Sequence, residues 1–243
     1  MSITEDMENA GNWLFRWRSY LPLLLIGFFF IALHDFHYPL NSHKLDQLWK
    51  IFCLLISFFG LVIRMYTVGT TPKGTSGRNT KEQVAIVLNT TGIYSITRNP
   101  LYLSNFIIFI GITLSLHVWW LVVMTTLIFI LYYERIIFAE EKFLKNKFGD
   151  VFSNWSNLTP LCFPKFKNWK SSSIPFSLRK AFRGEYSGFF AILASMTLLE
   201  LIENKIVSGK FYLDKLWTVL FVFGLVIYLT LRTLKKKTKF LDP

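Results

Sequence analysis

Long apolar runs separated by short polar stretches dominate the hydropathy pattern of this chain. A membrane-spanning helix needs about 20 consecutive, mainly apolar residues, and six runs approach that length. They cover residues 20–36, 48–68, 100–116, 119–138, 188–202 and 216–231. The fifth run is the weakest, because it is short and ends in Glu200 and Glu203. The pattern predicts an all-α integral membrane protein with about six transmembrane helices.

A very short connection joins the third and fourth apolar runs. It consists of His117 and Val118, which leaves room only for a tight antiparallel helical hairpin. One helix of this hairpin begins at Pro100, and the other returns near Phe138. Residues 98–102 and 140–141 are therefore expected at the same membrane face, although they are far apart in the sequence.

Composition and charge agree with a multi-pass membrane protein. The 243 residues are 52% hydrophobic and 18% aromatic, with a mean hydropathy of +0.39, which lies outside the usual balance of a soluble domain. Most Lys and Arg residues fall on the side that holds both termini and the two longest loops, so the positive-inside rule places that side in the cytoplasm. The membrane is expected to be a bacterial inner membrane or the endoplasmic reticulum.

The net charge of +12 follows from this topology. It also favours contact with anionic lipid head groups. Nucleic-acid binding is not expected, because no basic domain stands free of the membrane. No cleavable signal peptide is expected, since the first apolar run follows an acidic stretch and lacks a small-residue cleavage pattern.

Asn99-Pro100 indicates the start of a helix at the membrane surface. An Asn side chain can cap the first backbone N–H groups, and Pro suits the first helical position. The helix start carries partial positive charge, Arg98 adds a full one, and Tyr102 lies about one turn further along. Such a site suits a carboxylate or a phosphate. The alternative is a capped helix whose arginine reaches lipid phosphate.

Glu140 and Glu141 follow the fourth apolar run. Acidic residues at the C-terminal end of a helix oppose its macrodipole, so a cationic ligand or hydroxyl groups that donate hydrogen bonds would stabilise them. The alternative is a pair of solvated carboxylates next to Lys142, Lys145 or Arg135.

Two linked motifs carry a resemblance to a known family. They are Gly92-x-Tyr94-x-x-x-Arg98-Asn99-Pro100-x-Tyr102-Leu103 and, after the hairpin, Glu140-Glu141-x-x-Leu144-x-x-x-Phe148-Gly149. Together with Thr159-Pro160 and Pro164, this pattern resembles the isoprenylcysteine carboxyl methyltransferase and phospholipid methyltransferase superfamily. The resemblance covers roughly residues 48–165. It implies an integral membrane enzyme that uses S-adenosylmethionine.

The resemblance also implies where the cofactor binds. The pocket would lie at the cytosolic ends of the third and fourth helices. Glu140 and Glu141 would hold the ribose, amino or adenine groups, and Arg98 and Arg135 are the candidate catalytic residues, with no general base identified. The methionine side would be lined by Gly92, Tyr94, Arg98, Asn99, Pro100, Tyr102 and Leu103.

This chain departs from the family pattern at several positions. Many members have His where this chain has Asn99, which leaves no imidazole there. Ser104 stands where Gly often follows, and Phe152 and Trp155 replace Tyr residues. The two phenol hydroxyl groups are therefore absent from that stretch.

The chemistry of methyl transfer narrows the expected acceptor. A methyl sulfonium is already activated, so the acceptor needs mainly desolvation and alignment. A phosphate or carboxylate oxygen is nucleophilic at neutral pH, whereas a lipid ammonium must first lose a proton. We therefore expect an anionic lipid head group, such as a phosphate of lipid A or a phospholipid, bound by Arg64, Lys73 and Arg78. Carboxyl methylation of a prenylcysteine-like substrate and N-methylation of phosphatidylethanolamine are the alternatives.

Two other classes of protein fit the sequence less well. A di-iron enzyme would need many histidines, and the four available all fall on the predicted extracytoplasmic side: His34, His37, His43 and His117. His34 and His37 have the i, i+3 spacing that could bind a metal, but interfacial histidines are the preferred interpretation, and we predict no metal site. A small transporter or scaffold would place charges or broken helices near the bilayer midplane. The charged residues here gather at the ends of the apolar runs instead.

The expected organisation has four parts. Residues 1–47 hold an N-terminal segment and the first helix, and residues 48–165 form the methyltransferase core. A basic interfacial linker covers residues 166–187, and residues 188–243 form a final pair of helices with no predicted role.

Overall fold

The computed structural model describes residues 2–34, 36–72 and 83–241, and this part of the chain is helical without a β-strand. The predicted all-α fold is confirmed. The helices are α1 (Ile3–Trp17), η1 (Leu21–Leu25), α2 (Ile26–His34), η2 (Pro39–Asn41), α3 (His43–Thr70), η3 (Ile93–Ser95), α4 (Pro100–Leu114), α5 (Trp119–Phe148), α6 (Asp150–Leu158), η4 (Phe166–Asn168), α7 (Leu178–Ser208) and α8 (Lys215–Lys237).

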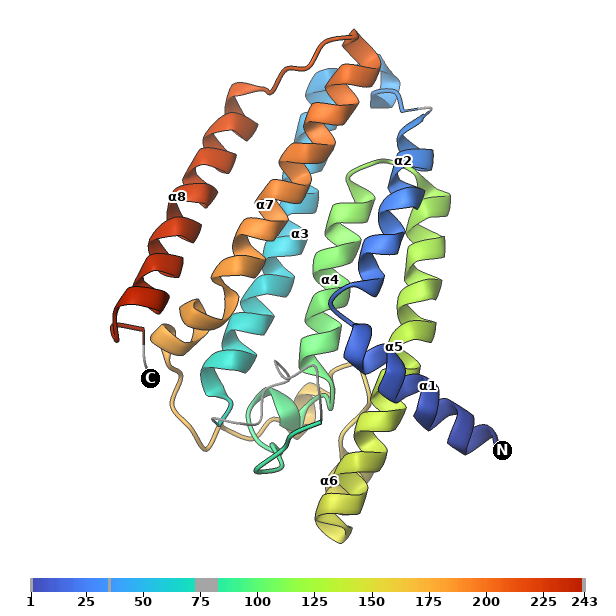
Figure 1. Cartoon of the computed structure of the whole chain (residues 1–243), viewed down its shortest axis with the longest axis vertical. Helices are drawn as coiled ribbons and strands as arrows, with labels where there is room; N and C mark the ends of the chain where they lie inside the picture. Colours follow the sequence, from blue (N-terminus) through green and yellow to red (C-terminus); the bar gives the residue numbers. More distant parts are fainter. Residues whose placement is uncertain (1, 35, 73–82, 242–243) are drawn as a thin grey trace.

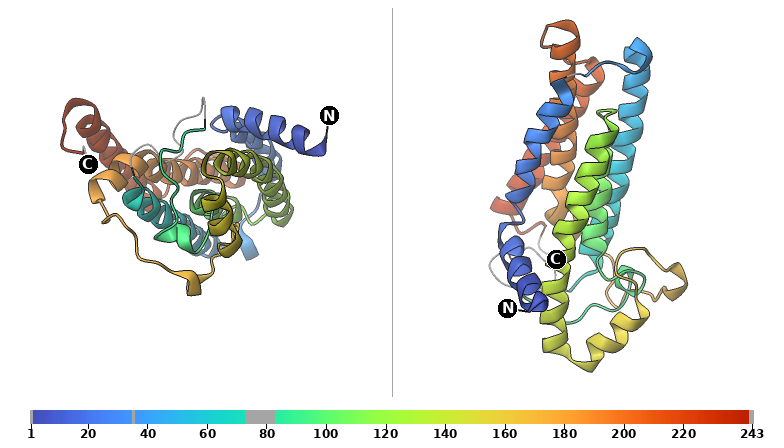
Figure 2. Two further views of the ribbon diagram at one scale, coloured as in Figure 1. Left: turned by 90° about the horizontal axis from the view of Figure 1, so that it is seen from below. Right: turned by 90° about the vertical axis from the view of Figure 1, so that its right-hand side faces the viewer.

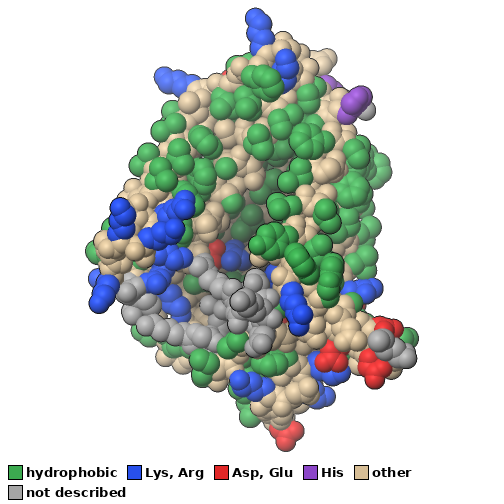
Figure 3. All heavy atoms as spheres, viewed as in Figure 1, with side chains coloured by type: hydrophobic (Ala, Val, Ile, Leu, Met, Phe, Trp, Pro, Cys, Tyr) green, Lys and Arg blue, Asp and Glu red, His purple; other side chains and the backbone are tan. Residues whose placement is uncertain are grey.

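The long helices form an elongated bundle. Figure 1 shows α2, α3, α4, α5, α7 and α8 running along the long axis, with α6 and the segment that follows it at one end. Both chain ends lie at that same end (Figures 1 and 2). Hydrophobic side chains cover the upper part of the face in Figure 3, whereas Lys and Arg side chains are frequent toward the lower end.

The predicted count of six spans is not confirmed. Among the described residues, α3, α5 and α8 are each long and apolar enough to cross a membrane. A fourth span arises if α1 and Leu21–His34 count as one element, but these two pieces meet at 84°. Helix α4 is shorter, with 15 residues. Helix α7 has the length, but it carries Glu185, Glu200 and Glu203 as buried residues.

The hairpin between the third and fourth apolar runs is confirmed. Helix α4 ends at Leu114 and α5 begins at Trp119. The same end of the bundle therefore holds the first residues of α4 and the last turns of α5, as Figure 1 shows.

Helices α3 and α4 pack closely because each has a glycine at their interface. A Cβ atom on Gly111 would lie 2.2 Å from the Ser57 hydroxyl and 2.7 Å from the Cys53 carbonyl oxygen. A Cβ atom on Gly60 would lie 2.8 Å from the Ser104 carbonyl oxygen. Small residues let membrane helices approach until their backbones touch, and here they bring Arg64 on α3 close to Asn105 on α4.

Gly111→Ala is expected to lower the free energy of unfolding by about 1–3 kcal/mol, the usual cost of overpacking. The added methyl group would meet backbone atoms of α3, which cannot move aside cheaply. Unfolding in mixed detergent micelles measures the change. Gly27→Ala is the matched control, because its Cβ would have nothing within 4 Å. Equal losses in the two variants would contradict close packing at Gly111.

The segment with the first motif is held by the chain that follows α6. The backbone N–H of Arg98 donates to the Pro160 carbonyl at 2.9 Å, and that of Gly92 donates to the Lys170 carbonyl at 2.9 Å. The Trp155 indole N–H donates to the Tyr94 carbonyl at 3.0 Å. The tryptophan that replaces a family tyrosine therefore fixes the backbone of the motif.

The predicted interfacial linker is shorter than expected. Helix α7 begins at Leu178, where the Ser177 side chain accepts a hydrogen bond from the Lys180 N–H. The first turns of α7 therefore come from the predicted linker, and they add Gly184 and Glu185 to the bundle as buried residues.

Candidate active site

A cavity of about 680 Å³ lies at the end of the bundle that carries both termini. Side chains from α1, α3, α4, α5 and α7 form its walls, together with residues 83–85 and the motif segment around Tyr94 and Arg98. Its volume is within the range of about 300–1,000 Å³ that is usual for small-molecule sites. Figure 3 shows a hollow on one face of the molecule with acidic and basic side chains inside it and hydrophobic side chains around it.

The cavity brings together most of the predicted cofactor residues. Those that line it are Tyr94, Arg98, Asn99, Pro100, Tyr102 and Glu140. Gly92, Leu103 and Glu141 are not among the lining residues. Gly92 instead makes a tight turn at φ +60°, a backbone conformation that glycine adopts without strain.

The predicted capping role of the Asn99 side chain is wrong. Pro100 does occupy the first position of α4, but the Asn99 side chain makes no capping hydrogen bond. Its amide donates to the Leu161 carbonyl at 3.2 Å instead. The side chain thus fastens the motif to the segment after α6, and the first N–H groups of α4 keep their partial positive charge at the cavity.

Arg98 and Glu141 form an ion pair across the two motifs. The Arg98 Nη1 and Glu141 Oε1 atoms are 3.0 Å apart, and the side chains are 19% and 28% exposed. The Arg98 Nε atom is buried and has no hydrogen-bond partner among the described residues. A buried N–H group without a partner is costly, so this atom is available to an acceptor on a bound ligand.

Tyr94, Tyr102 and Glu140 form a second polar group in the cavity wall. The Tyr102 hydroxyl is in hydrogen-bonding contact with the Glu140 carboxylate, and Arg18 Nη1 lies 3.9 Å from Glu140 Oε1. Burial raises the pKa of Tyr94 well above its usual value, and the nearby Glu140 carboxylate raises it further. Tyr94 therefore stays neutral at physiological pH and can donate a hydrogen bond.

A third polar group joins α3, α4 and α7. The Arg64 guanidinium donates to Glu185 through Nε at 2.8 Å and through Nη2 at 3.1 Å, and its Nη1 donates to the Asn105 side-chain oxygen. All three residues line the cavity. Paired in this bidentate way, Arg64 is fixed in orientation, and its charge is balanced by a carboxylate.

The other predicted site residues lie elsewhere. The Arg135 side chain is exposed and does not line the cavity, although a Cβ atom on Gly11 of α1 would meet the Arg135 backbone carbonyl. Lys73 and Arg78 lie outside the described residues.

Sequence reasoning missed the wall that α7 contributes. This wall consists of Gly184, Glu185, Ser187, Gly188, Ala191, Ile192 and Ser195. Small residues recur at spacings of four, as in Gly184 and Gly188, and an acidic residue stands among them. Spacings of three and four place residues on one face of a helix, so this pattern marks a face that leaves room for a ligand.

Comparison with known proteins agrees with the two motifs. The family model for phospholipid methyltransferases matches residues 49–151, which run from α3 into the start of α6. Residues 49–151 are therefore similar to the phospholipid methyltransferase family, and we call them the family segment. The match agrees with the predicted superfamily and methyltransferase class, and the apolar helices agree with an integral membrane protein.

One curated relative adds a more distant likeness. The nickel-cobalt-cadmium resistance protein NccN of Alcaligenes xylosoxydans xylosoxydans is 32% identical over 130 residues, which are 53% of this chain. The match spans 58% of the relative's own length. No solved structure matches the chain.

The family segment, residues 49–151, supplies only part of the cavity. Arg64, Tyr94, Arg98, Tyr102 and Glu140 come from it, whereas Arg18 and Glu185 lie outside the matched residues. Helix α1 and helix α7 therefore close a site whose centre comes from the family segment.

Proposed function

We propose that the protein transfers a methyl group from S-adenosylmethionine to the head group of a membrane phospholipid. The observation that carries the proposal is the single cavity that joins the two family motifs to the Arg64–Glu185 pair. The charge bias toward the end with both termini supports a cytoplasmic position for this cavity.

The residues near the two motifs suit S-adenosylmethionine, which supplies an already activated methyl group when bound. The free Nε atom of Arg98 and the start of α4 favour its carboxylate. The carboxylate of Glu140 favours its positively charged and hydroxyl groups. Tyr94 and Tyr102 offer aromatic surface next to these charges, and a cation over an aromatic ring is stabilised.

The Arg64–Glu185 pair suits the acceptor. Because Glu185 balances the charge of Arg64, the pair is complementary to a head group that carries both signs, with its phosphate near Arg64 and its ammonium near Glu185. Glu185 is 3% exposed and is the carboxylate on the α7 wall. It can accept the proton that an ammonium must lose before its nitrogen becomes a nucleophile. This arrangement favours the amine of a phosphoethanolamine head group.

An anionic acceptor is the second candidate. Arg18 and Arg98 also line the cavity, and arginine is well suited to bind phosphate. Methylation of a lipid phosphate, as in lipid A, would use these cations together with the predicted Lys73 and Arg78. Carboxyl methylation of a prenylcysteine-like substrate would place the label in protein, and a transporter or scaffold would transfer no label.

Incubation of membranes that contain the protein with methyl-labelled S-adenosylmethionine tests the proposal. We expect the label in the phospholipid fraction, where acid hydrolysis releases it as N-methylated ethanolamine. Lipid label released as methyl phosphate or methanol would favour the phosphate acceptor, and label only in protein would favour the prenylcysteine-like one. Membranes with Glu185→Gln are expected to lose at least tenfold in rate, whereas the exposed control Glu134→Gln keeps the wild-type rate.

A further inference from the structure

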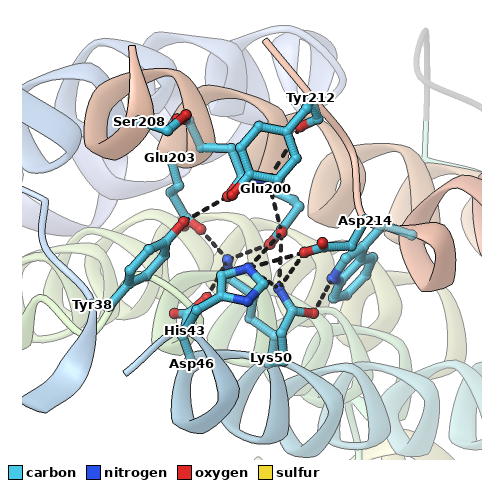
Figure 4. Close-up of polar contacts among 12 residues, drawn as sticks. Tyr38, His43, Asp46, Lys50, Glu200, Glu203, Ser208, Tyr212 and Asp214 are labelled. Carbon is cyan, nitrogen blue, oxygen red and sulfur yellow. Dashed lines mark hydrogen bonds and ion pairs between the residues drawn. The ribbon is translucent and has the colours of Figure 1, made fainter. Parts of the chain in front are cut away.

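The end of the bundle opposite the cavity holds a second polar cluster. We call it the far-end cluster; its members are His43, Asp46, Lys50, Glu200, Glu203 and Asp214, from α3, α7 and the residue before α8 (Figure 4). Asp46, Lys50, Glu200 and Glu203 are almost completely buried. No part of the proposed methyl transfer uses this cluster.

Lys50 neutralises the inner half of the far-end cluster. Its ammonium lies 2.7 Å from Asp46 Oδ2 and 2.5 Å from Glu200 Oε2, and it contacts Glu203 Oε2. The ammonium donates hydrogen bonds to Glu200 and Glu203. Its single positive charge is shared among the three carboxylates.

The outer half consists of His43, Glu200 and Asp214. His43 Nε2 lies 3.0 Å from Asp214 Oδ2 and 3.9 Å from Glu200 Oε1. All three ligand atoms are within 4.8 Å of one another. Ligand atoms around a tetrahedral zinc ion are roughly 3.3 Å apart, given bond lengths near 2.0–2.1 Å, so small side-chain adjustments would bring these three atoms to a shared ion.

Charge in the far-end cluster is unbalanced. Four carboxylates face the single ammonium of Lys50. The imidazoles of His43 and His117, each 3.0 Å from an aspartate of the cluster, are charged only when protonated. The Oε1 atom of Glu203 is buried without a hydrogen-bond partner among the described residues, and Figure 4 shows this side chain pointing into the cluster. Buried charges are normally paired or bind metal ions. The cluster therefore has the donor atoms and the negative charge for one more cation.

A path from solvent reaches the outer half. The side chains of His43 and Asp214 are 36% and 30% exposed, whereas Glu200 behind them is fully buried. The Gln47 amide nitrogen now lies between the ligands, 2.8 Å from Glu200 Oε1 and 3.2 Å from Asp214 Oδ2. It occupies the position at which a cation would contact both carboxylates.

We propose that His43, Glu200 and Asp214 form a binding site for a divalent cation of the zinc class. One imidazole and two carboxylates, with an open side toward water, are the ligands that zinc accepts when three protein groups bind it. An imidazole ligand disfavours Mg²⁺ and Ca²⁺, which prefer oxygen. The sequence alone showed no sign of this site, because Glu200 and Asp214 lie 157 and 171 residues beyond His43.

Isothermal titration with ZnCl₂ tests this site in the detergent-solubilised full chain after removal of any polyhistidine tag. We expect saturable binding with one ion per chain, and no competition from a large excess of Mg²⁺. His43→Ala and Asp214→Asn are each expected to weaken binding at least tenfold, since even second-shell changes cost 10–100-fold. The control His37→Ala, with an exposed side chain outside the cluster, keeps the wild-type affinity.

Absence of saturable binding, or wild-type affinity in both His43→Ala and Asp214→Asn, overturns the proposal. Equal competition by Mg²⁺ overturns it as well. X-ray absorption by the zinc-loaded wild type gives a test that needs no variant. An imidazole in the zinc coordination shell supports the site, and a shell of oxygen atoms only overturns it.

Discussion

Arg98→Ala is expected to lower the affinity for S-adenosylmethionine at least tenfold, which corresponds to about 1.4 kcal/mol. The substitution removes the Nε donor that lacks a partner in the cavity and the cation that faces the Glu141 carboxylate. A charge-assisted hydrogen bond is worth more than a neutral one, and this one forms in a half-buried position. Isothermal titration of the solubilised protein measures the affinity.

The controls separate binding from folding. Arg16→Ala removes an exposed arginine of α1 that does not line the cavity, so its affinity should equal that of the wild type. Glu141→Gln, which keeps the size of the side chain, is expected to weaken binding less than Arg98→Ala, because Glu141 is not among the lining residues. If Arg98→Ala binds the cofactor like the wild type, the assignment of Arg98 to the cofactor is wrong.

Lys50→Met is expected to destabilise the protein by about 3–5 kcal/mol, the usual result of removing one partner from a buried ion pair. Methionine is of similar length and apolar, so it leaves Asp46, Glu200 and Glu203 together without the ammonium that contacts all three. Carboxylates in such a site must then take up protons or draw in water. The free energy of unfolding in mixed micelles measures the loss.

Two further variants make the Lys50 result specific. Lys44→Met changes an exposed lysine six residues before Lys50 on the same helix. It should leave the free energy of unfolding almost unchanged. Adding Glu203→Gln to Lys50→Met removes one of the stranded charges and should restore part of the lost stability. Equal stability of Lys50→Met and the wild type would show that the ammonium does not hold the cluster together.

Hydropathy and loop length predicted the central hairpin because both are local properties. Proline favours the first position of a helix regardless of tertiary contacts, so Pro100 marks the start of α4. Two residues between apolar runs permit only a tight reversal of the chain. Helix α7 was harder to predict. Its buried Glu200 and Glu203 interrupt the apolar run, although in the bundle they face Lys50 of α3 rather than lipid. The hydropathy of one segment gives no information about an oppositely charged residue on another helix that can neutralise its buried charge.

The candidate site also has residues that the sequence could predict and residues that it could not. The motif residues Tyr94, Arg98 and Tyr102 were found because their spacing resembles a family pattern, and the cavity brings them together. Glu185 carries no such motif, and its pairing with Arg64 joins residues 121 positions apart. Asn99 was misread because the same amide can cap a helix or fasten a distant loop, and only the position of Leu161 decides between them.

The cavity has two walls of different origin. The wall that faces the proposed methyl donor comes from the family segment, whereas much of the opposite wall comes from α7, beyond residue 151. A change in α7 can thus reshape the space for the acceptor without moving any atom that would hold the donor. Under the proposed function, exchange of this one helix is a direct route to a new choice of lipid beside an unchanged donor site.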